Sequence, residues 1–206
     1  MHRIAALALA VGLSCCVAVA AHAAAGQFVD GGFEQPVVPV GGFSDFSTGQ
    51  TIDKWSVVGA SGNVSLVSTT FSQNGIAFPA HSGHQWLDLT GVSQTATGVQ
   101  QTVRTVPGSD YTLTFFVGNV VNPGGIFGTT STVDVFMDGT RLMTATNVLG
   151  KGKNRLVWQK FTTTITATGT RTTFAFINGD PASDTLCGLD AVSLALVPPE
   201  TDPASE

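Results

Sequence analysis

Hydrophobic and polar residues alternate along most of the chain after residue 28, in short runs separated by glycine, asparagine, aspartate and proline. Because successive side chains of a strand point to opposite faces, such runs predict β-strands with one buried face. The predicted strands are 52–58, 63–67, 85–90, 98–105, 111–118, 132–138, 141–146, 156–167, 170–177 and 186–196. No long segment has helical periodicity, so the pattern predicts an all-β protein folded as a two-sheet β-sandwich.

The same alternation assigns side chains to faces. The predicted core residues include Leu87, Leu89, Leu113, Phe115, Val117, Val133, Val135, Met137, Val192, Leu194 and Leu196. The opposite positions would share one outer face, provided that the registers hold: Trp86, Asp88, Phe116, Asp134 and Phe136. A register slip of one residue would invert this assignment.

Three long loops interrupt the strands, at 36–51, 68–83 and 119–131. Loops of this length in a compact domain more often carry a function than merely connect two strands. We therefore expect the long loops to contribute to the functional site.

The first 25 residues have the pattern of a cleaved signal peptide. A short basic start is followed by an apolar run over 4–21 and by Ala21-His22-Ala23, an A-x-A end. A membrane anchor and a lipoprotein signal at Cys15 are the rival interpretations. Cleavage predicts a secreted protein, extracellular or periplasmic, with one domain over 26–196 and a flexible, proline-rich tail over 197–206.

Composition excludes several classes of function. The chain has 14 acidic and nine basic residues, a net charge of −5, so it lacks the basic excess that nucleic-acid binding needs. Beyond the leading segment no apolar run is long enough to span a membrane. Removal of Cys15 and Cys16 with the signal would leave Cys187 alone, which excludes an internal disulfide and favours a small buried side chain.

Six segments carry a family resemblance when they are taken in order. They are Asp30-Gly31-Gly32-Phe33-Glu34-Gln35-Pro36, Ile52-Asp53-Lys54-Trp55-Ser56-Val57-Val58-Gly59, Leu87-Asp88-Leu89-Thr90-Gly91, Val106-Pro107-Gly108-Ser109-Asp110-Tyr111, Trp158 and Cys187-Gly188-Leu189-Asp190. Over 27–196 the chain resembles the domain-of-unknown-function 642 family of secreted plant and bacterial proteins. The resemblance implies a galactose-binding-like jelly roll, related to carbohydrate-binding modules. Asp30 stands where the family usually has asparagine, and the extra cysteines of plant relatives are missing.

Related sugar-binding modules hold a structural calcium ion with two carboxylates at the positions of Glu34 and Asp190. The resemblance therefore implies calcium here, because a hard cation with six to eight oxygen ligands suits two carboxylates and loop carbonyls. The alternative is that both carboxylates accept hydrogen bonds from loop amides. His81 and His84 lack the further ligands that a zinc site needs.

The candidate ligand-binding residues are Trp86, Asp88, Asn119 and Asp134. Sugar rings stack on aromatic side chains, and their hydroxyls need directed polar partners, which carboxylates and amides provide. The alternatives are that the aromatic residues form a second core under the loops and that Asn119 caps a turn. A glycosidase built on Asp88 and Asp134 is a third interpretation, although no residue pattern marks a catalytic acid and base.

The sequence thus predicts a secreted, non-catalytic protein that binds a glycan, either an exopolysaccharide or a cell-wall polysaccharide. The alternative is a structural protein of an extracellular matrix or surface layer that associates through protein–protein contacts.

Overall fold

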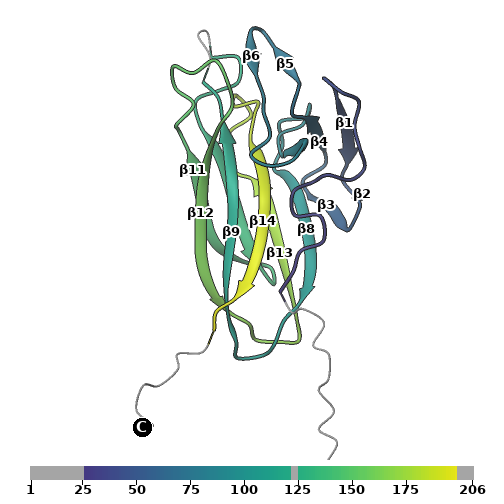
Figure 1. Ribbon diagram of the computed structural model, residues 1–206, viewed down its shortest axis with the longest axis vertical. Helices are drawn as coiled ribbons and strands as arrows, with labels where there is room; N and C mark the ends of the chain where they lie inside the picture. Colours follow the sequence, from purple (N-terminus) through teal and green to yellow (C-terminus); the bar gives the residue numbers. More distant parts are fainter. Residues whose placement is uncertain (1–25, 122–124, 199–206) are drawn as a thin grey trace, which may run out of the picture.

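The computed structural model describes residues 26–121 and 125–198, and the predicted signal peptide and most of the predicted tail lie outside them. Two six-stranded antiparallel sheets form a sandwich (Figure 1). The first sheet has the order β1 (Phe43–Ser47), β4 (Asn63–Ser68), β7 (Gln85–Asp88), β14 (Gly188–Leu196), β9 (Asp110–Asn119) and β12 (Val157–Thr166). The second has the order β11 (Thr140–Asn147), β10 (Ser131–Met137), β13 (Arg171–Asn178), β8 (Thr97–Arg104), β3 (Trp55–Gly59) and β2 (Thr51–Ile52). A small hairpin of β5 (Ser72–Gln73) and β6 (Ile76–Ala77) lies at the end of the sandwich opposite the last residues of β14.

The main core fills the space between the two sheets. Phe115 of β9 contacts Phe176 of β13 edge to face, with 5.4 Å between ring centroids. Trp55 of β3 is fully buried and stacks on Phe28 at 5.2 Å. Aromatic rings that bridge facing sheets in this way bury large apolar areas and fix the spacing of the layers.

The alternation of the sequence predicted most of this architecture. Each of the ten predicted strands corresponds to a strand of the structure, except that 52–58 is broken into β2 and β3 by a turn at Asp53, whose φ is 46°. The predicted inward residues of β9 and β7 are fully buried, as predicted. Leu196 is half exposed, so its assignment to the core was wrong.

A second, smaller hydrophobic cluster covers the outer face of the first sheet. We call it the outer cluster; its buried members are Val67, Ile76, Phe78, Trp86, Val120, Phe127, Leu156 and Leu186. Trp158 packs on its edge, and the indole lies over Gly118 and Gly188, where a Cβ atom would come within 3.2 Å of the ring. Glycine at these two positions therefore lets the ring lie flat on the sheet.

Close backbone packing inside the second sheet gives the first test. A Cβ atom at Gly98 would overlap the carbonyl oxygen of Phe176 on the neighbouring strand. We expect Gly98→Ala to destabilise the fold by about 2 kcal/mol or more, because the two strands must move apart. Gly169 has only ordinary contacts, so Gly169→Ala should change the free energy of unfolding by less than about 0.5 kcal/mol. Equal unfolding free energies for the two variants in urea titrations would contradict the strand packing.

Candidate ligand pocket

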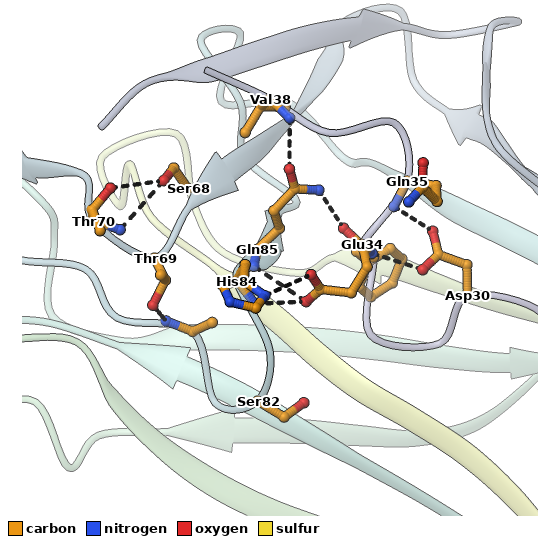
Figure 2. A network of polar contacts seen from close by, with 12 residues as sticks. Asp30, Glu34, Gln35, Val38, Ser68, Thr69, Thr70, Ser82, His84 and Gln85 are labelled. Atoms are coloured by element: carbon orange, nitrogen blue, oxygen red, sulfur yellow. Dashed lines mark hydrogen bonds and ion pairs between the residues drawn. The ribbon is translucent and has the colours of Figure 1, made fainter. Parts of the chain in front are cut away.

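A tight turn near the start of the domain positions Glu34. The Asp30 carboxylate accepts hydrogen bonds from the amides of Glu34 (2.7 Å) and Gln35 (3.1 Å). The indole nitrogen of Trp55 donates to the Asp30 carbonyl at 2.9 Å, which ties this turn to the main core. The side chain of Glu34 is thereby directed at the loop that precedes β7 (Figure 2).

Glu34 binds the second half of that loop. Its Oε1 accepts hydrogen bonds from the amides of His84 (2.9 Å) and Gln85 (3.2 Å). Gly83 has a φ of 66°, and a Cβ atom there would overlap the Glu34 carboxylate. Glycine is therefore required at this position both for the backbone conformation and for the approach of the carboxylate.

Asp190 binds the first half of the same loop. Its Oδ2 accepts hydrogen bonds from the amides of His81 (2.9 Å) and Ser82 (3.1 Å), and its Oδ1 accepts one from Ala191. Burial raises the pKa of Asp190 to about 7 against these hydrogen bonds, and the nearby charge of Glu34 adds to the increase. The structure thus places Glu34 and Asp190, which come from opposite ends of the chain, on the same loop.

The side chain of Gln85 completes this network. Its Oε1 accepts a hydrogen bond from the Val38 amide at 2.6 Å, and its Nε2 donates to the carbonyls of Phe33 (2.9 Å) and Pro36 (3.1 Å). Figure 2 shows this amide between the loop and the N-terminal segment. The first residue of β7 is therefore fixed through both its backbone and its side chain.

The groups around Glu34 and Asp190 do not fit a calcium ion as they stand. The groups that converge on both carboxylates are N–H donors, whereas calcium requires a shell of oxygens. Within the part of the chain that the structure describes, no cluster of three or more His, Cys, Asp or Glu side chains suits a metal. The geometry favours the alternative of amide hydrogen bonds, and calcium binding stays a prediction.

A pocket of about 390 Å³ opens on the outer face of the first sheet, beside the outer cluster. We call it the β4–β7 pocket, because these two strands form its floor. Its lining residues come from both strands and from the loops around them: Phe43, Ser65, Val67, Phe71, Gln73, Phe78, Trp86, Asp88, Gly91, Val92, Gln94, Ile126, Phe127, Thr185 and Leu186. All three segments that were predicted to be long loops contribute lining residues.

Trp86 lies in the floor of the pocket. It is 1% exposed, and its indole nitrogen donates to the Phe78 carbonyl at 3.0 Å, so the second-core interpretation describes it better than a stacking platform does. The accessible rings are those of Phe43, 44% exposed, and Phe71, whose centroids lie 5.7 Å apart. Sequence reasoning missed both rings, although each lies in a segment that was predicted to be a long loop.

Asp88 is the charged residue of the pocket floor. Its Oδ1 accepts hydrogen bonds from the Thr90 amide (3.1 Å), the Thr90 hydroxyl (2.8 Å) and the Cys187 amide (3.1 Å). No described residue donates to Oδ2, and no buried side-chain oxygen of the described residues lacks a partner, so Oδ2 faces the solvent of the pocket. Burial raises the pKa of Asp88 to about 7, and the hydrogen bonds to Oδ1 oppose the increase.

The predicted common outer face is wrong, because its members lie on two different sheets. Asp134 and Phe136 belong to β10 in the second sheet, where Asp134 pairs with Arg141 at 2.9 Å. Phe116 lies on the first sheet, but His81 stacks on its ring at 3.5 Å. Asp88 and Asp134 therefore do not flank one cleft, and the glycosidase geometry suggested for them is not assembled.

Asn119 does not line the pocket. It is 1% exposed, its Nδ2 donates to Ser131 and its Oδ1 accepts a hydrogen bond from the Gly150 amide. Both halves of the amide are used to join three chain segments, so the structural interpretation describes this residue. Its predicted role as a ligand contact has no support in its position.

A family model described as "Protein of unknown function (DUF642)" matches residues 26–195. The chain belongs to the DUF642 family. The six ordered motifs of the sequence lie within the matched residues, which include all of the strands except the last residue of β14. No curated protein has a matching sequence.

Solved structures are similar to this DUF642 domain at low identity. A cyclase from Fischerella sp. TAU is 21% identical, with a TM-score of 0.59, over 85% of this chain and 98% of the other. The CBM22-1 xylan-binding domain of Xyn10C from Paenibacillus barcinonensis is 14% identical, with a TM-score of 0.47, over 79% and 99%. A family 35 carbohydrate-binding module from Clostridium thermocellum is 11% identical, with a TM-score of 0.45, over 74% and 96%.

Chelation tests the hydrogen bonds at Glu34 and Asp190. Because loop amides satisfy both carboxylates, we expect EDTA to leave the thermal midpoint of unfolding unchanged, and added calcium to raise it by less than about 1 °C. The measurement is differential scanning calorimetry of a chain that begins at residue 26. A midpoint that rises progressively with calcium and falls with EDTA would show that an ion takes the place of the amides.

The pH dependence of stability follows from the buried carboxyl groups. Burial raises the pKa of Asp88 and Asp190 to about 7 and that of Asp180 to about 6, all from 3.8. Between the ordinary and the raised pKa values the folded state then binds more protons than the unfolded state. The free energy of unfolding should therefore fall as pH rises from 5 to 8. The pKa of His81 is lowered from 6.5, so below pH 6.5 this group makes the free energy of unfolding rise with pH. Urea titrations across this range measure the net slope.

Asp88→Asn isolates one of these groups. Asparagine keeps an acceptor for the donors on Oδ1 and removes the buried charge, so the variant should come closest to the stability of the natural chain at or below pH 3.8, where Asp88 is largely protonated in the folded state. At pH 8 it should be more stable, by on the order of 1–3 kcal/mol. A variant less stable than the natural chain at pH 8 would mean that the charge of Asp88 stabilises the fold.

Proposed function

We propose that this protein is an exported, non-catalytic glycan-binding protein, and that the β4–β7 pocket is its binding site. The observation that carries the proposal is the composition of the pocket: the accessible rings of Phe43 and Phe71 line the same cavity as the Asp88 carboxylate. A sugar presents C–H faces to rings and hydroxyl groups to acceptors, and the pocket offers both within one concave space.

The size and rigidity of the pocket also support a binding role. Its volume of about 390 Å³ is near the lower end of the range of ~300–1,000 Å³ for small-molecule sites. The floor is anchored by the hydrogen bonds of Trp86 and Asp88, so little conformational entropy is lost when a ligand binds. This geometry suits a short saccharide or the end of a longer chain.

Export is the part of the proposal that rests on sequence. The basic start, the apolar run and Ala21-His22-Ala23 support cleavage and secretion, to the periplasm or beyond. A glycan-binding protein would meet exopolysaccharides and cell-wall polysaccharides in those compartments.

Removal of the two accessible rings tests the binding site. The soluble chain is first screened against an array of plant, bacterial and fungal polysaccharides, and the strongest ligand is then titrated by calorimetry. Phe43→Ala and Phe71→Ala should each weaken binding by about 2- to 10-fold, because a ring contact contributes ~0.5–1.5 kcal/mol.

The matched control is Phe136→Ala, which removes an aromatic side chain from the outer face of the second sheet. It should bind as tightly as the natural chain. If the control lost binding and the two pocket variants did not, the binding site would lie on the second sheet instead. A folded chain that binds no glycan on the array would refute the proposed function and favour a structural matrix protein.

A further inference from the structure

The β4–β7 pocket has an acidic lining without a basic side chain. Asp88 is the one ionisable residue among the described residues that line it, and none of them is lysine, arginine or histidine. The Asp45 carboxylate lies just beyond the floor and accepts a hydrogen bond from the Ser65 hydroxyl. An anion in the pocket would therefore meet negative charge without a compensating cation.

The hydroxyl groups that line the pocket already donate hydrogen bonds to other groups of the protein. The Ser65 hydroxyl donates to Asp45, and the Thr185 hydroxyl donates to the Ile126 carbonyl at 2.7 Å. Each of these oxygens presents only lone pairs to the pocket, as Oδ2 of Asp88 does when the carboxyl is ionised, above its pKa of about 7. The side-chain donors that remain are the neutral amides of Gln73 and Gln94.

We propose that the β4–β7 pocket selects neutral sugar units and rejects uronic acids and other acidic sugars. This inference rests on the proposed function and narrows its ligand class. A neutral sugar brings several O–H donors to a pocket rich in acceptors, so each of its hydroxyls can be satisfied. A uronate replaces a donating CH₂OH group with a carboxylate, which can only accept and which carries the wrong charge.

The apolar rim reinforces this choice. Val92 is 61% exposed and Ile126 is 48% exposed, and both border the opening together with Phe43. A carboxylate that crosses this rim would lose water without gaining a partner, whereas the C–H faces of a neutral ring lose little. The rim and the floor therefore favour the same class of sugar.

Paired oligosaccharides test the selection. The probes are galactan, glucan and mannan fragments, each matched with the oligouronide of the same ring stereochemistry. Calorimetry is done at low ionic strength, where charge repulsion is least screened, and at pH 8, above the pKa of Asp88. For the stereochemistry that binds, we expect the neutral fragment to bind at least about 10-fold more tightly than the uronide.

Two variants assign the selection to this pocket. Asp88→Asn replaces the free acceptor with a donor. Gln73→Lys adds a cation at an exposed lining position. Because position 73 is exposed, the second variant should fold even if the first does not. Each should raise uronide affinity relative to the neutral partner, by about 10-fold. A natural chain that binds the uronide as tightly as the neutral fragment overturns the inference, as does an unchanged ratio in both variants. Absence of binding to every neutral fragment and every uronide would instead refute the proposed function itself.

Discussion

Two carboxylates, the buried Asp190 and the half-buried Glu34, hold the loop over 81–85 by accepting four of its backbone hydrogen bonds. One comes from the N-terminal segment and the other from β14, so three distant parts of the chain meet at this loop. The loop leads directly into β7, whose Trp86 and Asp88 form the floor of the β4–β7 pocket. The position of the pocket floor therefore depends on these hydrogen bonds.

Burial of carboxylate charge destabilises the folded state, and hydrogen bonds from the loop amides offset part of that cost. Burial raises the pKa of Asp190, while three amide hydrogen bonds favour its ionised form. Removal of either carboxylate would leave amides of the loop without acceptors, which costs more than the mean value of a hydrogen bond. Such a network fixes a single loop conformation, and a site built on it is preorganised for its ligand.

Alternation in the sequence predicted the strands and their inner residues because that pattern depends only on the period of a strand. Leu113, Phe115 and Val117 were assigned to the core from their spacing and are fully buried. Alternation does not say which sheet a strand joins, which is why Asp134 was placed on the same face as Asp88. The pairing of strands far apart in sequence decides that, and no local signal records it.

The segments that cover the outer face of the first sheet also could not be predicted from local sequence patterns. β1 and the β5–β6 hairpin lie inside segments predicted to be loops, and the latter segment buries Trp86. Phe43 and Phe71 become pocket residues only when these segments fold over the sheet. The length of the loops was the available signal, and it indicated the right segments without indicating the residues.

The central claim is that a neutral sugar occupies the β4–β7 pocket, and a crystal structure of the chain with its strongest oligosaccharide ligand tests it most directly. We predict that a sugar ring lies against Phe43 and Phe71 and that one of its hydroxyls donates to Oδ2 of Asp88. A ligand bound on the outer face of the second sheet, with the β4–β7 pocket occupied only by water, would contradict the account.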